Sequence, residues 1–440
     1  MNRICKLALL ISLIIFNGDL FSQNQWTLEK CIEHAKSNNL QIKKQELAVE
    51  QSKNNILESQ LSFIPSVNAS LNHNMNWGRS VNLQDLQIIH NKLSQSSSAN
   101  IGASITLFEG LKKINQLKSN KVSYQIALKN IEKLKNDISI NIAKSYLETL
   151  LAYELEQVAE QNFKSINEQV ERVKKLVNAG KEANTKLLEM QAQLASERFQ
   201  YISAQNNVRT NLLTLAQLLD LESLADFDIT KPKIDALFDV VSQENITDIF
   251  NSATNLPQIK SAELELKNSE LQYKIQKGLA LPQLSFSAGY GTYYSDNQTE
   301  KFFNQFNNNR NPSIGFGLSI PIFNNWRNNT AIKNARLAIK SAQIDLKQTN
   351  QALYKEIQQA YYDAIAAYEK YKASEQNLVS MEEVYKFTEQ KFDLGMLNST
   401  DYTVARTNLF KSQSEFYQSK FQYLFQLKIL DFYKGIPITL

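Results

Sequence analysis

Two hydrophobic periods alternate along the chain, and the shorter one predicts four β-strands. The runs that show it are residues 66–76, 97–108, 283–294 and 313–323. In the third run, Phe286 and Ala288 alternate with Ser285 and Ser287, so the apolar side chains share one face of a strand. The other face is small and hydroxylic rather than charged. Since a tilted membrane strand needs about 9–11 residues, we expect one face on lipid and the other on a wet lumen.

The longer period, near 3.6 residues, predicts two helical hairpins. Gly180 is the only glycine between residues 111 and 277, and Gly395 is the only one between 318 and 434. No proline lies between Pro65 and Pro232 or between Pro321 and Pro437. Because both residue types weaken or end helices, helices of roughly 100 Å can run up to each glycine.

Apolar residues along these helices follow the 3-4 spacing of a coiled-coil seam. The seam positions are Phe163, Ile166, Val170, Val173 and Val177 in the first hairpin, and Leu378, Met381, Tyr385, Thr388 and Phe392 in the second. We expect the charged flanks, Arg172 among them, to face solvent. Each glycine then permits a left-handed helix end, and Asn184–Thr185 and Ser399–Thr400 are expected to cap the returning helices.

The two sets of elements form an internal duplication. Gln41-Ile42-Lys43 recurs as Gln258-Ile259-Lys260, and Gly180 recurs as Gly395. A repeat this long is one structural unit written twice rather than a solenoid. We therefore divide the chain into a leader (1–22), a first repeat (23–219), a connecting collar (220–256) and a second repeat (257–440). Each repeat is expected to hold a helix, two strands and a helical hairpin.

The first 22 residues read as a secretory signal peptide. Arg3 and Lys6 precede the apolar run from Leu7 to Phe16, and Ser22 offers a cleavage site. An uncleaved anchor is the alternative, although the run is too short to span a bilayer. Cys5 would leave with the signal, so Cys31 alone cannot form an internal disulfide. We expect Cys31 to lie on a helix face, because the residues before it, Leu28-Glu29-Lys30, do not suit lipid attachment.

Composition and charge argue against several function classes. The net charge is only +4 over 440 residues, with 43% hydrophobic residues, and no basic stripe predicts a nucleic-acid partner. His34, His73 and His90 are the only histidines, and they lack the spacing of metal ligands. We find neither a phosphate-binding loop nor a nucleophile motif, so we expect no enzyme, no metal and no cofactor.

Several short motifs, taken in order, resemble the TolC-like outer-membrane efflux proteins. They are Trp26-Thr27-Leu28 with Cys31 and Ala35, Leu281-Pro282-Gln283-Leu284, Ile320-Pro321-Ile322-Phe323 and the two tip glycines. The resemblance implies a mixed α+β membrane protein: a trimeric 12-stranded β-barrel, with four strands per chain, continued by a long α-helical coiled-coil tunnel into the periplasm. It also implies a homotrimer in outer-membrane lipid, partnered by a periplasmic adaptor (membrane fusion) protein and an inner-membrane RND or ABC-type pump.

The same resemblance suggests the functional positions. The hairpin tips would meet the adaptor, through Ala179, Gly180, Lys181, Leu394, Gly395, Met396 and Leu397. The channel entrance would be formed by Asp401 and Tyr402 on the returning helix of the second hairpin. Lys186 takes the place of Asp401 in the first repeat, and Leu397 stands where the family has a basic residue. A carboxylate in the first turn of a helix is an equally good explanation of Asp401.

One alternative from another class stays open on the sequence alone. A secreted periplasmic coiled-coil adaptor or scaffold would share the hairpins, but it would not need four strands long enough to span a membrane. We also expect the asparagine-rich segments 73–98 and 295–312 to be polar outer loops with little to pack.

Overall fold

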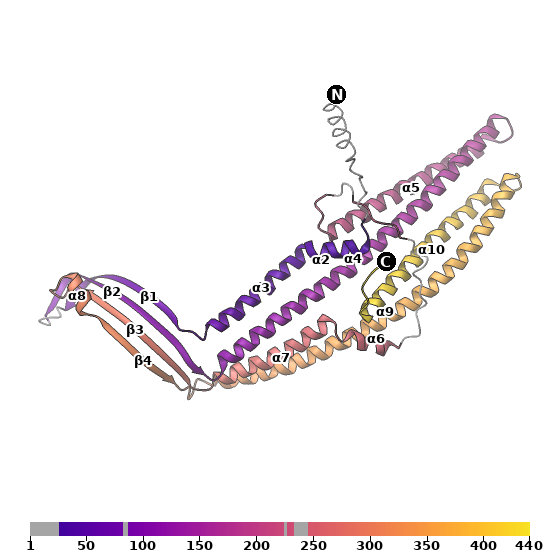
Figure 1. Cartoon of the computed structure of the whole chain (residues 1–440). Helices are drawn as coiled ribbons and strands as arrows, with labels where there is room; N and C mark the ends of the chain where they lie inside the picture. The colour runs from indigo at the N-terminus through magenta and orange to yellow at the C-terminus, as the bar shows by residue number, and fades with distance from the viewer. Residues whose placement is uncertain (1–25, 82–86, 224–226, 233–244) are drawn as a thin grey trace, which may run out of the picture. The chain divides into compact units, whose positions relative to one another are not determined.

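The computed structural model describes residues 26–81, 87–223, 227–232 and 245–440, so the predicted signal peptide lies outside it. The elements in chain order are α2 (Leu28–Asn38), α3 (Leu40–Leu61), β1 (Ser66–Val81), β2 (Ile88–Glu109), α4 (Lys112–Asn178), α5 (Asn184–Leu218), α6 (Ile246–Ala253), α7 (Pro257–Gly278), β3 (Gln283–Ser295), α8 (Phe302–Asn308), β4 (Asn311–Ser319), α9 (Arg327–Asp393) and α10 (Ser399–Lys434) (Figure 1). Each repeat thus has the predicted plan of lead-in helix, two strands and helical hairpin.

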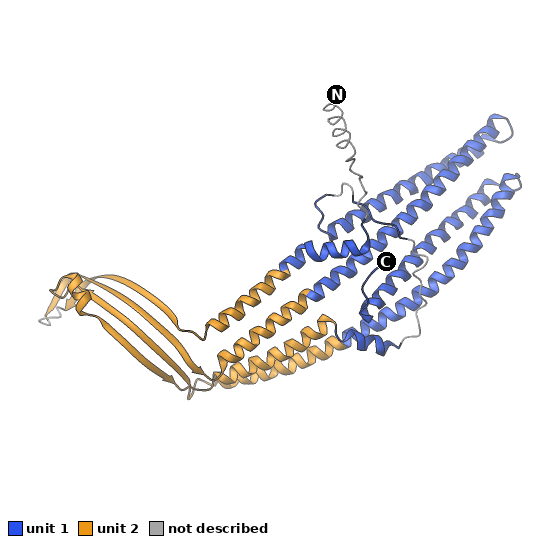
Figure 2. Ribbon diagram, in the orientation of Figure 1, with its two compact units in different colours: residues 1–44, 132–255, 351–440 blue, residues 45–131, 256–350 orange. Residues whose placement is uncertain are grey.

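The chain divides into two compact units (Figure 2). Unit 1 comprises Met1–Lys44, Glu132–Asn255 and Gln351–Leu440, and it holds both hairpin tips. Unit 2 comprises Gln45–Ile131 and Leu256–Asn350, and it holds the sheet with the helices that adjoin it. The long helices α4 and α9 contribute residues to both units.

Unit 2 contains one antiparallel sheet in the order β1-β2-β3-β4. The central pair, β2 with β3, joins the first repeat to the second. In the register, Ile105 pairs with Phe286, which pairs with Phe316, while Ser104 pairs with Ser287, which pairs with Gly315. The predicted separation of an apolar face from a polar face therefore holds across the strands.

The strand lengths differ from the prediction. β1 and β2 have 16 and 22 residues, so most of the segment expected as an outer loop (73–98) is paired strand, although 82–86 lies outside the described residues. Here the otherwise apolar face also carries polar residues, such as His73 opposite Ser97, which hides the alternation in the sequence. At the other end, β4 stops at Ser319 rather than at residue 323, because Pro321 has no backbone N–H for a ladder.

The second expected loop is also structured. It contains α8, which packs on β3: the Phe302 ring lies 4.9 Å from that of Tyr294, and the Thr292 hydroxyl donates to the Phe306 carbonyl at 2.6 Å. The Gln305 side chain is buried and bonds both the N–H and the carbonyl of Ser295. The expectation that this segment has little to pack is wrong.

The long helices match the prediction closely. α4 and α9 each have 67 residues, which gives roughly 100 Å at 1.5 Å per residue. In the predicted seam of the first hairpin, Ile166, Val170 and Val173 are buried. They form a core with Met190, against which Val177, Leu187 and Leu194 are packed. In the described part of the chain, no helix is both long and apolar enough to cross a bilayer.

Both repeats pass from strand to long helix through two consecutive left-handed residues. Gly110 and Leu111 have φ of 60° and 62°, and Asn325 and Trp326 have φ of 53° and 61°. In the first repeat the backbone also passes very close to α7, since a Cβ added to Gly110 would lie 2.3 Å from the carbonyl oxygen of Gly278. The junction therefore requires glycine at 110 for two separate reasons.

The segment proposed as a collar (220–256) is only partly described. Ile229 forms a parallel bridge with Trp26, and the Tyr146 hydroxyl donates to the carbonyls of Trp26 and Thr230. α2 packs at the same place, capped by Thr27 and with Cys31 fully buried. These contacts lie within unit 1; the domain boundaries stay a prediction.

Candidate functional site at the hairpin tips

The two hairpins turn through the same backbone motif. Gly180 and Gly395 have φ of 69° and 73°, and in each case the glycine N–H bonds the carbonyl three residues back and the next N–H bonds the carbonyl five residues back. This is the Schellman motif, which satisfies two carbonyls at a helix end and favours glycine at the left-handed position. The prediction of left-handed glycines is confirmed at both tips.

The caps of the returning helices differ from the prediction. α5 starts after Ala183, whose side chain makes no capping bond. α10 starts after Asn398, whose Oδ1 accepts the Asp401 N–H at 2.8 Å. The residues expected to cap, Asn184–Thr185 and Ser399–Thr400, lie inside the helices instead. In α10 the amide of Asn398, one position earlier, satisfies the N–H of Asp401.

The tips expose different chemistry. Ala179, Gly180 and Lys181 are exposed and form a small, polar apex. In the second hairpin the exposed fractions of Leu394 and Met396 are 76% and 69%, whereas Leu397 is half-buried. Apolar residues this exposed at a turn are candidates for contact with another surface.

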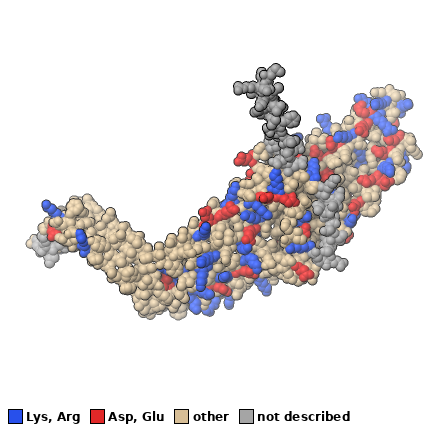
Figure 3. Space-filling view, in the orientation of Figure 1, with Lys and Arg blue, Asp and Glu red and all other residues tan. Residues whose placement is uncertain are grey.

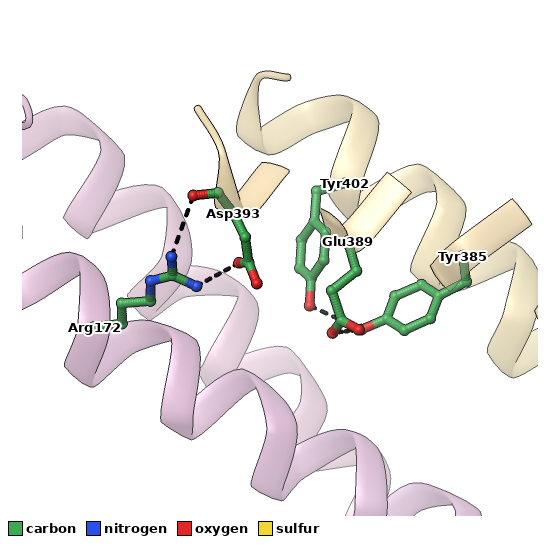
Figure 4. A network of polar contacts seen from close by, with 5 residues as sticks. All are labelled: Arg172, Tyr385, Glu389, Asp393 and Tyr402. Atoms are coloured by element: carbon green, nitrogen blue, oxygen red, sulfur yellow. Dashed lines mark hydrogen bonds and ion pairs between the residues drawn. The ribbon is translucent and has the colours of Figure 1, made fainter. Parts of the chain in front are cut away.

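Behind the second tip lies an aromatic cluster. Tyr402 is fully buried, and its ring stacks on Phe392 at 4.5 Å. Its hydroxyl shares a 2.9 Å hydrogen bond with that of Tyr385, which in turn donates to Glu389 at 2.8 Å (Figure 4). Burial, and then the bond to Tyr402, raises the pKa of Tyr385 well above its ordinary value. The Tyr385 hydroxyl therefore stays neutral and acts as a hydrogen-bond group.

Asp401 lies next to this cluster but faces outward. Its side chain is exposed, while its neighbour Tyr402 points into the hairpin. Asp401 is also the acidic residue of the first turn of α10, where a carboxylate is favoured by the helix dipole. The two predicted entrance residues thus differ in environment, with Tyr402 buried and Asp401 exposed, and only Asp401 presents a charge to solvent.

Four contacts link the two hairpins of the chain near these tips. Arg172 of α4 binds the carboxylate and the carbonyl of Asp393 (Figure 4), and Ser399 donates to Glu189 at 2.9 Å. The other two are the Lys186 ammonium, 5.1 Å from the Phe392 ring, and the hydrogen bonds of the Arg406 guanidinium to Asn162. Arg172, which the sequence predicted to face solvent only, therefore contributes to the link between the two hairpins.

These contacts are individually weak. The side chains of Arg172 and Asp393 are 46% and 40% exposed, and such pairs contribute about 0–1 kcal/mol. Arg406 is buried, but its Nη1 has no hydrogen-bond partner among the described residues. A cation buried in this way costs desolvation that its contacts offset only in part. The hairpins have apolar cores of their own, so the link between them is the softer connection.

Sequence reasoning did not find this network. Tyr385 and Phe392 were predicted only as seam residues, and neither Glu189 nor Arg406 was singled out. One signal was present: Arg406 follows the buried Tyr402 by one helical turn, so a charged residue occupies an apolar stripe. Ion pairs between helices far apart in the sequence leave no such mark.

Comparison with known proteins identifies the family. Residues 31–220 and 251–435 match the family described as outer membrane efflux protein, once in each repeat. The chain is 21% identical to outer membrane protein TolC of Vibrio cholerae over 296 residues, covering 65% of this chain and 64% of that protein. It is 22% identical to the alkaline protease secretion protein AprF of Pseudomonas aeruginosa, covering 68% and 62%. The matches thus span less than two thirds of these relatives.

Solved structures agree in fold over nearly the whole chain. CusC superposes with a TM-score of 0.79 at 17% identity, covering 94% of this chain and 93% of that one. The CmeC outer membrane channel of Campylobacter jejuni gives 0.77 at 18% identity, covering 94% and 86%. The expected fold of long helices and strands in two repeats is confirmed. With both repeats matched, the chain belongs to the outer membrane efflux protein family.

Proposed function

We propose that the protein is an outer-membrane exit channel that extends into the periplasm. It would conduct substrates passively from an inner-membrane pump of the RND or ABC type, through a periplasmic adaptor, to the outside, in efflux or type I secretion. One observation carries the proposal: a four-stranded sheet with one apolar and one polar face is followed in each repeat by a 67-residue helix. A scaffold without a barrel would leave that sheet unexplained.

A homotrimer follows from the edges of the sheet. β1 and β4 each have one partner strand within the described chain, and open edges are not tolerated in lipid. The smallest membrane barrels have about eight strands, so one chain cannot close, whereas three chains supply twelve. Exposed leucines and isoleucines on the helices support the same packing: Leu40, Leu47 and Leu61 on α3, and Leu337 and Ile344 on α9.

The test is direct. The purified protein should have the mass of three chains in detergent and should form conducting channels in planar bilayers. A protein that stays monomeric and non-conducting, and that fractionates with the soluble periplasm, would contradict the proposal and favour the scaffold.

The tips are the proposed docking and gating region. The adaptor would contact Ala179 to Lys181 and Leu394 to Leu397, because the exposed Leu394 and Met396 need a partner surface. Opening would part the hairpins of each chain, which requires breaking only weak contacts such as that of Arg172 with Asp393. Tyr402 would hold the second tip rigid through Tyr385 and Phe392 while the hairpin moves.

Asp401→Asn is expected to remove most of the block of single-channel conductance by divalent cations. In a trimer three exposed Asp401 carboxylates would converge at the entrance, and a ring of negative charge selects cations. Lys186→Gln is the matched control, because Lys186 is paired with Glu182 at 2.9 Å and lies over Phe392. Block that survives Asp401→Asn unchanged would leave Asp401 as a helix-start residue and place the entrance elsewhere.

Gly395→Val is expected to abolish export while leaving the trimer intact. A β-branched residue at φ 73° is strained, although nothing lies within 4 Å of the added Cβ, so the damage is confined to the turn. Gly395→Asn should retain export, since asparagine tolerates the left-handed conformation. Drug susceptibility of the host reports the result, and full resistance with Gly395→Val would refute the role of the tip.

A further inference from the structure

Along most of its length, the polar face of the sheet carries no charged residue. The charged positions lie near its two ends, where Glu109 pairs with Gln283 and Lys92 pairs with Gly78. Over Ser66–Trp77, Leu93–Phe108, Gln283–Ser295 and Asn311–Ser319, the sequence contains no Asp, Glu, Lys or Arg. Serine, asparagine, threonine and glycine make up nearly all of the polar face, as in the pairs Ser66 with Ser104 and Ser104 with Ser287. The one titratable side chain in these spans apart from tyrosine, His73, pairs with Ser97 on the opposite, apolar face.

The polar face is also low in relief. The side chain of Asn100 lies over Gly291, where an added Cβ would meet Asn100 Oδ1 at 2.5 Å, and the Ser285 hydroxyl lies over Gly317, at 2.9 Å from such a Cβ. Ser285 also donates to the Gly317 carbonyl. Hydroxyl and amide groups are thus folded down on the backbone rather than projecting from it.

The long helices differ from the sheet in their content of charged residues. Lysine and glutamate are spread along α4 and α9, whereas the visible surface of the sheet is almost free of charge (Figure 3). Ion selectivity in a pore is produced by rings of charged side chains, and at physiological salt a charge is screened beyond about 8 Å. Charges on the helices therefore exert little effect on a solute in the middle of the barrel.

We propose that the stretch of this face between Glu109 and Lys92 forms an exit lumen without charge selection, so that cationic, anionic and zwitterionic solutes pass through it equally well and are sorted there by size alone. The inference rests on the proposed channel, whose inside it describes. It assigns any charge discrimination to the helical part of the duct and to the two ends of the barrel, and it predicts that the middle of the barrel does not confine the substrates to one sign of charge.

Thiol labelling from outside the cell tests the lumen. The Ser287→Cys variant places a thiol on the polar face, and the rates of its reaction with a trimethylammonium and a sulfonate methanethiosulfonate are compared. Background is low because Cys31 is fully buried, and burial raises the pKa of its thiol to about 12, which leaves almost no reactive thiolate. Ser313→Cys on β4 serves if the first variant assembles poorly.

For an uncharged lumen, the ratio of the two rates should equal that of a small free thiol in the same buffer. A ratio shifted about tenfold or more in either direction, the equivalent of a strong local potential, would overturn the inference. Adding Ser104→Asp, opposite Ser287 in the register, is the positive control and should shift the ratio toward the cationic reagent. Any effect of the carboxylate on the thiol itself cancels in the ratio.

A second control separates this inference from the channel itself. Phe286→Cys, on the apolar face, should react with neither reagent, because both are excluded from lipid. Equal labelling of Phe286→Cys and Ser287→Cys would mean that the sheet is not a membrane barrel, so the proposed function would fail. Selective labelling of Ser287→Cys with a biased ratio would leave the channel standing and reject only the uncharged lumen.

Discussion

Replacing Phe286 with arginine is expected to block assembly of the channel in the outer membrane. Phe286 lies on the apolar face of the sheet, with its ring 5.1 Å from that of its cross-strand neighbour Phe316. An arginine facing lipid near the bilayer midplane costs about 2–4 kcal/mol, and a trimer would carry that cost three times. The measurement is the amount of SDS-sensitive trimer recovered from outer-membrane fractions.

The adjacent residue supplies the control. Ser287→Arg introduces the same side chain on the opposite face, where water solvates the guanidinium, so the trimer should form at normal levels with reduced conductance. Leu318→Arg should resemble Phe286→Arg, since Leu318 is on the apolar face and 65% exposed in the single chain. If the arginine variants of both faces assembled equally, the assignment of faces would be wrong.

Gly110→Ala is expected to prevent folding of the sheet region. The residue has φ of 60°, which costs an alanine about 1–2 kcal/mol. In addition, the new Cβ would lie 2.3 Å from the Gly278 carbonyl oxygen, and backbone atoms cannot move aside cheaply. Together we expect a loss of about 3 kcal/mol or more, measured as a lower midpoint of chemical denaturation and little assembled trimer.

Two further alanine variants isolate the causes. Gly435 has the same type of conformation, φ 83°, but a Cβ added there meets nothing within 4 Å. Gly435→Ala should therefore lose only the stability that corresponds to the strained left-handed backbone. Gly278→Ala lacks the positive φ but clashes with the Gly110 carbonyl at 2.6 Å. Equal stabilities of the Gly110→Ala and Gly435→Ala proteins would show that the close approach is not a constraint.

The fold could be predicted from the sequence wherever a local pattern carries it. Phe286 alternating with Ser287 specifies the faces of a strand, and the lone glycines at 180 and 395 specify where the long helices turn. Because the chain is duplicated, each of these patterns occurs once in each repeat, and the two occurrences support each other. The site residues at the tips follow from the same glycines, and their assignment to adaptor contact and channel entrance stays a prediction.

The rest depends on contacts that no local pattern records. The outer end of β1 and β2 is rich in asparagine and serine on both faces, so pairing there comes from the extension of an existing ladder. α8 forms because Gln305 can bond the backbone of Ser295, a tertiary contact. Likewise the Arg172 and Asp393 pair joins residues from different repeats, and each looks like an ordinary surface charge in its own helix.

The central pairing of β2 with β3 also has a consequence for how the chain is made. β2 finds β1 at once, but its second partner follows only after α4, α5 and the connecting segment have been synthesised and exported. Until then β2 presents an unpaired edge and an apolar face to the periplasm, the kind of surface from which aggregation starts. Pairing between such distant segments is slow because loop closure precedes any gain from the contact. The nascent protein is therefore expected to depend on periplasmic chaperones during this interval, and truncation before residue 283 should leave a product that is degraded rather than a stable half-channel.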